Sequence, residues 1–245
     1  MTIYDKIIEQ INKLIDDFTI ENDIVAKKLN ITTGNITSNE NNLILKSEMA
    51  YELGGGLKNA ISGIAFSDNS MTEDEILLIG PDLDKIKEDI SYARITILDV
   101  DDSEWKDNAK AYSSLRNITY TRYHVFPKGY MMRISTSAHK EPVRIGKKEI
   151  RKGLDFSYAG SCFIEGYHKN KDVKRVKVIF ITDERFPYDR LLELAKKSMD
   201  ITQSLNHIFD NLKMDCTSCS MKKICDEVEG LKKVHMEQNG KRQIQ

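Results

Sequence analysis

The chain has 245 residues, of which 40% are apolar and 31% charged, with 13 Gly and 4 Pro. This composition is that of a globular protein with one large domain or two small ones, and it excludes collagen-like and disordered chains. The 37 basic residues nearly cancel the 38 acidic ones, so no overall field attracts nucleic acid or an acidic membrane. No apolar run approaches the roughly 20 residues of a membrane span, and the charged start is unlike a signal peptide. We therefore expect a cytoplasmic protein that binds neither nucleic acid nor membrane.

The start of the chain has a helical pattern. Apolar residues recur every three or four positions from Ile3 to Phe18, which predicts an amphipathic helix. A shorter helical stretch is expected at 21–29. Residues 31–42 are rich in Asn, Ser and Gly, which favour turns. We therefore expect an N-terminal helical segment over residues 1–40.

The next part of the chain shows strand patterns, in which branched apolar residues gather in short runs. Strands are predicted at 76–80, 94–100, 119–126, 130–136, 155–167 and 174–182. The third and fourth flank Pro127-Lys128-Gly129, which predicts a hairpin turn. A helix is expected over 102–115.

A long helix is predicted from Leu191 to Leu212, where apolar residues follow a helical period and lead directly to the cysteines. Together these elements predict an α+β fold with a mixed sheet and flanking helices. We expect this α+β domain to cover residues 41–212. The long helix would present a Cys-rich metal-binding segment, 213–245, at one edge of the sheet.

Three of the four cysteines, Cys216, Cys219 and Cys225, lie within ten residues, and His235 follows. Two thiolates separated by two residues can bind one metal centre from a single turn, and the later residues can close the site. Zinc accepts three Cys and one His, and iron–sulfur clusters accept thiolates with an occasional imidazole, so both metals stay open. Unliganded, reduced thiols are the other interpretation. Cys162 lies in an apolar stretch and is expected to be buried and inert.

Two basic stretches could bind an anion. Their candidate ligands are Arg144, Lys147, Lys148 and Arg151 in the first stretch, and Lys174 and Arg175 in the second. If the stretches converge in space, they could hold the phosphates of a nucleotide-type ligand such as coenzyme A, or an acidic partner protein. The other interpretation is a solvated basic face balanced by the acidic segments 73–89 and 99–107.

The glycines Gly54, Gly55 and Gly56 lack the spacing of a dinucleotide-binding or P-loop fingerprint. We expect them to form a turn where backbones approach closely. No Ser-His-Asp or Cys-His elbow motif is present in the sequence, so no catalytic residue is assigned.

Several segments occur in an order that resembles the beta subunit of the archaeal CO dehydrogenase/acetyl-CoA synthase complex and the matching region of bacterial acetyl-CoA synthase. They are AYELGGGLKNA, ILLIGPDLDKI, GYMMRIST, VKVIFITDERFPYDRLLELAKKSMDI and the C-x2-C segment, within about residues 48–235. In that family the C-x2-C begins a four-iron cubane joined to two nickel ions. These metals assemble acetyl-CoA from CO, a corrinoid-borne methyl group and coenzyme A.

The resemblance implies a role for each candidate ligand. Cys216 and Cys219 match the first two cluster cysteines, and Cys219 matches the one that also bridges to nickel. Cys225 matches the third after a loop shorter by three residues, and His235 stands at the spacing of the fourth cysteine. The family's later Cys-Gly-Cys motif, which holds the distal nickel, is absent from this sequence, so we expect a truncated relative.

The resemblance therefore implies an anaerobic iron–sulfur protein, with a 4Fe-4S cluster, that has an accessory, sensor or electron-transfer role in CO, one-carbon and corrinoid metabolism. Its expected partners are a corrinoid protein or components of the CO dehydrogenase/acetyl-CoA synthase complex, with coenzyme A as a candidate ligand. One alternative is a subunit of a split CO-methylating acetyl-CoA synthase, an acyltransferase that acts with a partner chain. Another is a zinc-stabilised protein interaction module.

Overall fold

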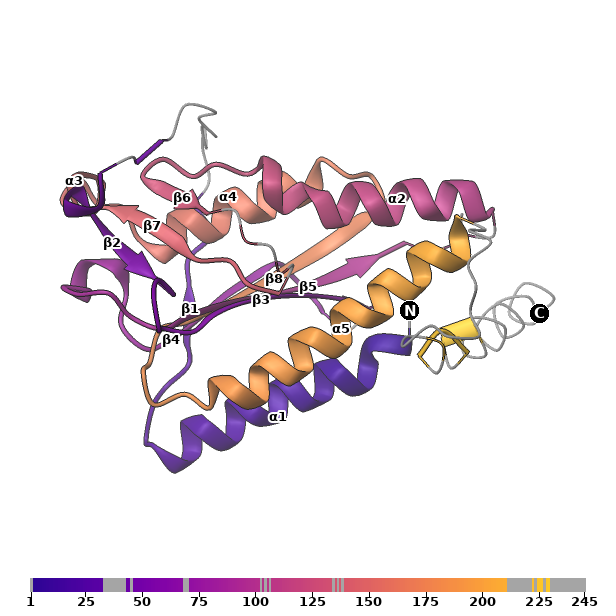
Figure 1. Ribbon diagram of the computed structural model, residues 1–245, viewed down its shortest axis with the longest axis horizontal. Helices are drawn as coiled ribbons and strands as arrows, with labels where there is room; N and C mark the ends of the chain where they lie inside the picture. The colour runs from indigo at the N-terminus through magenta and orange to yellow at the C-terminus, as the bar shows by residue number, and fades with distance from the viewer. Residues whose placement is uncertain are drawn as a thin grey trace.

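The protein has an α+β fold with a mixed sheet between helices, as the sequence predicts (Figure 1). The computed structural model describes residues 2–32, 43–44, 46–67, 71–101, 103, 105, 107–133, 135, 137, 139–210, 222, 224–226 and 228–229. None of the described helices is long and apolar enough to cross a membrane.

Five strands form the main sheet. In spatial order they are β1 (Lys27–Leu29), β4 (Glu75–Ile79), β8 (Val173–Ile181), β5 (Tyr92–Val100) and β3 (Ala60–Ser67). The β4–β8 and β5–β3 pairs are parallel, whereas β1–β4 and β8–β5 are antiparallel. The predicted strands at 76–80, 94–100 and 174–182 are therefore confirmed, and two of them, β5 and β8, form the centre of the sheet.

Helices cover both faces of this sheet. In Figure 1, α1 (Asp5–Glu21) and α5 (Tyr188–Phe209) lie on one face, and α2 (Asn108–Thr121) and α4 (Phe156–His168) lie on the other. Every residue of β5 is consequently buried, as expected for a strand covered on both sides.

The predicted N-terminal helix is confirmed. The inward face of α1 consists of apolar residues at helical spacing: Ile7, Ile8, Ile11, Leu14, Ile15 and Phe18. Just before it, the hydroxyl of Tyr4 is 2.8 Å from Thr202 Oγ1 on α5. The two helices on this face are thus joined by apolar packing and by a buried hydrogen bond.

A second, three-stranded antiparallel sheet adjoins the main one. Its order is β2 (Ala50–Leu53), β7 (Val143–Gly146) and β6 (Tyr130–Met132), and α3 (Lys147–Ile150) follows β7. Single 3-10 turns are present at Thr2–Tyr4 (η1), Ser47–Met49 (η2), Leu83–Lys85 (η3) and Arg122–His124 (η4). Gly54 N donates to Ile90 O at 2.7 Å, which attaches the small sheet beside the start of β5.

The predicted strand at 155–167 is wrong, because these residues form α4. The Asp155 side chain accepts from Tyr158 N at 2.8 Å and caps the helix. Most of α4 is buried, so its apolar residues do not follow one helical face. A short buried helix and a buried strand have the same kind of apolar run in the sequence.

The predicted hairpin of 119–126 with 130–136 is also wrong. Helix α2 begins later than expected, at Asn108, and extends through Thr121 into η4, while β6 pairs with β7. Ala111, Leu115 and Ile118 are buried at helical spacing. Their packing outweighs the β propensity of the Thr and Tyr residues that follow.

The shorter predicted helix at 21–29 is absent. Helix α1 ends at Glu21, Asp23 has a positive φ of 51°, and β1 pairs with β4 from Lys27 onward. By contrast, the long predicted helix is confirmed as α5 up to Phe209, and its predicted end at Leu212 lies outside the described residues.

The three glycines form the expected turn after β2. Gly54 has φ 73°, and a Cβ there would lie 2.3 Å from Ala60 Cβ. Gly56 has φ 59° but no atom within 4 Å of such a Cβ. A side chain at Gly54 would therefore meet both backbone strain and steric overlap, whereas a side chain at Gly56 would meet backbone strain alone.

We expect Gly54→Ala to lower the free energy of unfolding by about 2–4 kcal/mol, since strain and overlap add. Gly56→Ala is the matched control and should cost about 1 kcal/mol, from strain alone. Urea denaturation of both variants measures the difference. Equal losses would contradict the close approach of Gly54 to Ala60.

Candidate functional site

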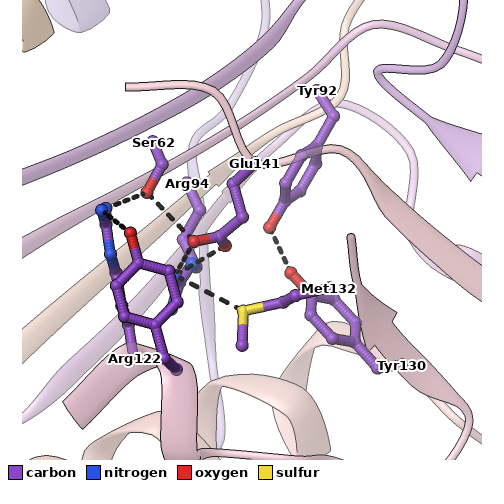
Figure 2. Close-up of polar contacts among 8 residues, drawn as sticks. Ser62, Tyr92, Arg94, Arg122, Tyr130, Met132 and Glu141 are labelled. Atoms are coloured by element: carbon purple, nitrogen blue, oxygen red, sulfur yellow. Dashed lines mark hydrogen bonds and ion pairs between the residues drawn. The ribbon is translucent and has the colours of Figure 1, made fainter. Parts of the chain in front are cut away.

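A charged side chain lies at the centre of the main sheet. Arg94 of β5 is only 1% exposed, and its Nη2 is 2.6 Å from Glu141 Oε1 and 2.7 Å from Oε2 (Figure 2). Its guanidinium carbon lies 3.7 Å from the ring centroid of Phe163 on α4. A buried charge is tolerated only when it is paired and bonded, and Glu141, just before β7, supplies that pair.

A chain of polar contacts leads from this ion pair toward the surface. Ser62 Oγ of β3 donates to Glu141 Oε2 at 3.3 Å and accepts from Arg122 Nη1 at 3.1 Å. Arg122 Nη2 donates to the hydroxyl of Tyr123, which is 48% exposed. We call Arg94, Glu141, Ser62, Arg122 and Tyr123 the arginine network.

Two tyrosines lie beside the ion pair and join the two sheets. The hydroxyls of Tyr92 on β5 and Tyr130 on β6 are hydrogen-bonded to each other (Figure 2). Burial raises the pKa of both phenols above the ordinary value. Both therefore stay protonated at neutral pH and act as hydrogen-bonding groups, not as acids or bases.

The arginine network ends at a cleft beside β3, which is an edge strand. The cleft has a volume of about 170 Å³ and is lined by Ser62, Tyr120, Arg122, Tyr123, Met199 and Gln203, among others. It lies where the end of α2 and η4 meet α5. Small ligand sites combine such mainly apolar walls with a few convergent polar groups.

Of the predicted metal ligands, only Cys225 lies in the described part of the chain. Cys216, Cys219 and His235 are outside it. Cys225 is partly buried, and its Sγ donates to Ser204 Oγ of α5 at 3.3 Å. Among the described residues, no group of three His, Cys, Asp or Glu side chains could hold a metal ion, so the predicted site stays a prediction.

Cys162 lies in α4, is 3% exposed and forms no disulfide. Burial raises the pKa of its thiol to about 12. The thiolate is the form that reacts and binds metals, so this cysteine is expected to be inert at neutral pH.

The first predicted basic stretch lies at β7 and α3. Arg144 Nε donates to Glu52 Oε1 at 2.6 Å, and Lys147 Nζ donates to the Glu48 carbonyl at 3.0 Å. Lys148 and Arg151 are exposed. Half of this stretch is therefore engaged with the neighbouring residues of β2 and η2.

The second stretch lies at the start of β8, where Lys174 pairs with Asp101 at 3.3 Å and Arg175 with Asp99 at 3.5 Å. Val173 pairs with the last residue of β5, whereas β2, the partner of β7, adjoins Ile90 just before β5. A nine-residue strand spans roughly 25–30 Å. The two stretches thus lie toward opposite ends of the sheet and do not form one site.

The arginine network was not predicted from the sequence. A signal was available in Arg94, a charge inside the predicted strand RITILDV, whose other residues are mostly apolar. A charge in a buried strand requires a counter-charge. However, Glu141 is 47 residues away, and no local pattern identifies it as the partner.

The fold and the site define an α+β protein whose two sheets are joined around a buried arginine–glutamate pair. The family model of the CO dehydrogenase/acetyl-CoA synthase complex beta subunit matches residues 31–186. The chain belongs to this family, as the order of its segments indicates. The match contains the whole arginine network but ends before α5 and the cysteine segment. Among curated proteins, none matches the chain.

Glu141→Gln tests the ion pair. We expect it to lower the free energy of unfolding by about 3–5 kcal/mol, because it leaves the Arg94 charge buried without a counter-charge. Urea denaturation measures the loss. Glu73→Gln, which removes an exposed carboxylate bonded to Lys28, is the control and should cost far less. A similar small loss for both variants would mean that Arg94 is compensated elsewhere.

Proposed function

We propose that this protein is an accessory iron–sulfur protein of the CO dehydrogenase/acetyl-CoA synthase beta-subunit family. Cys216, Cys219, Cys225 and His235 would hold a four-iron cluster next to α5. The protein would act as a sensor or electron carrier in the cytoplasm of an anaerobic cell, in CO, one-carbon and corrinoid metabolism.

The proposal rests mainly on the position of Cys225. Its thiol contacts Ser204 of α5, and Val228, one helical turn later, is 2% exposed and part of the core. The described part of the cysteine segment therefore contacts α5, the helix that directly follows the family-matched region. Cys216 and Cys219 precede Cys225 by nine and six residues, a spacing that suits three thiolates of one metal centre.

The donor set suits a metal centre. Cys225 is only partly buried, so its thiol is accessible and can exchange the Ser204 hydroxyl for a metal, unlike the buried thiol of Cys162. Three thiolates and one imidazole are accepted by iron–sulfur clusters and by zinc. Membership of a family of complex subunits supports iron and supports protein partners. Such a cluster would supply one-electron chemistry. Imidazole in place of one thiolate raises the reduction potential of the cluster.

Anaerobic purification tests the proposal, with iron, nickel and zinc analysis and a visible spectrum on one sample. We expect about four irons per chain and broad visible absorption. Colourless, iron-free protein would contradict the proposal. Stoichiometric zinc would instead support an interaction module, and nickel-dependent exchange of CO with acetyl-CoA alongside a Cys-Gly-Cys partner would support a split synthase.

The ligand assignment has a matched pair of variants. Cys225→Ser should lose most of its iron, because serine is a poor ligand for a soft metal site. Cys162→Ser should keep its iron, because that thiol is buried within α4. Metal analysis and circular dichroism of both variants separate lost binding from lost folding. Equal iron in both would remove Cys225 from the ligand set.

A further inference from the structure

The cleft beside β3 has the composition of a ligand site. Its floor is the strand around Ser62, and its walls come from two helical elements on either side of that edge strand. On one wall stand Tyr120 and Tyr123, which are 51% and 48% exposed. On the other wall stands Met199 of α5. A positively charged side chain, Arg122, reaches the cleft from within the arginine network.

Two of the groups that hold Arg122 are hydroxyls, which a stronger acceptor can replace. Arg122 is 9% exposed, and it donates to Ser62 at 3.1 Å and to the hydroxyl of Tyr123. The guanidinium carbon also lies 4.6 Å from the centroid of the Tyr123 ring. Charge-assisted bonds from arginine to a carboxylate are stronger than bonds to a neutral hydroxyl, and the planar groups match. A carboxylate in the cleft would therefore displace the Tyr123 hydroxyl.

The charges around Arg122 favour an anion. The arginine network contains two guanidinium groups and one carboxylate, and both oxygens of that carboxylate already contact Arg94. Nearby, the backbone N–H of Ser62 donates to the His139 carbonyl at 2.8 Å. Burial lowers the pKa of the His139 imidazole, and Lys196 and Lys140 lower it further, while Asp200 opposes them. Within the arginine network itself, two guanidinium groups thus face a single carboxylate.

The walls favour an aromatic body. The rings of Tyr120 and Tyr123 lie edge to face, with centroids 5.9 Å apart. Arg116 covers one side of Tyr120, 5.5 Å from its centroid. Two half-exposed tyrosines and a methionine offer apolar surface that a bound ring would remove from water.

We propose that this cleft binds a small aromatic carboxylate, with its carboxylate on Arg122 and its ring packed against the two tyrosines and Met199. The site is separate from the proposed metal site and depends on no metal.

Titration of the full-length protein with benzoate, followed by ligand-observed NMR and calorimetry, tests the proposal. We expect saturable binding, weaker binding of cyclohexanecarboxylate, and weaker binding still of inorganic phosphate. Phosphate binding without benzoate binding would overturn the aromatic assignment. If none of the three ligands shows saturable binding, the proposed site itself is overturned.

Substitutions identify the contacts. Tyr123→Phe keeps the ring but removes the competing hydroxyl, so it should tighten benzoate binding several-fold. Arg122→Met should weaken it by about tenfold or more. Lys110→Gln, at an exposed position of α2 that does not line the cleft, is the control and should change benzoate binding little. Unchanged or weaker binding by Tyr123→Phe would contradict the displacement, even if Arg122→Met fails to fold.

Discussion

The antiparallel pairing of β5 with β8 is the constraint on which the rest of the structure depends. The two nine-residue strands pair from Ala93 opposite Ile181 to Val100 opposite Val173. Each then adds a parallel neighbour, β3 beside β5 and β4 beside β8. With the centre fixed, helices pack on both faces, and every side chain of β5 is removed from water. The same pairing places the two basic stretches near opposite ends of the sheet, so they cannot share a ligand.

Because β5 is buried, the charge of Arg94 has a high desolvation cost. Glu141, from the segment before β7, offsets this cost by pairing with Arg94. An ion pair of this kind rarely adds net stability over apolar residues, but removing one partner is costly. The ion pair does specify geometry. Glu141 joins the small sheet to the main sheet through Arg94, and Ser62 joins Glu141 to Arg122 by hydrogen bonds. All five residues of the arginine network fall within the family-matched region, so the network lies in the part of the chain that this family's model covers.

The sequence predicts the helices that are buried on one side and the strands that are mostly apolar. Helix α1, helix α5 and strands β4, β5 and β8 all meet this condition. It fails for α4, whose burial on nearly all sides hides its helical period, and for the end of α2, whose Thr and Tyr residues have β propensity. The candidate site residues also differ in how far the sequence predicts them. Clustered cysteines are visible as a local motif, whereas the arginine network joins residues of β3, β5, η4 and the segment before β7 that only the tertiary fold brings together.

Helix α5 links the two proposed sites although it lies outside the family-matched region. Met199 lines the cleft and Ser204 contacts Cys225. They lie five positions apart in the helix, about 7.5 Å along its axis. Between these positions, the Thr202 hydroxyl bonds Tyr4, just before α1, which holds α5 against the rest of this helical layer. A helix fixed in this way can support both proposed sites. The anion site lies beside β3, and the metal segment follows α5 in the chain. Neither site needs to supply a ligand to the other. The two proposed sites therefore share a support but not their chemistry.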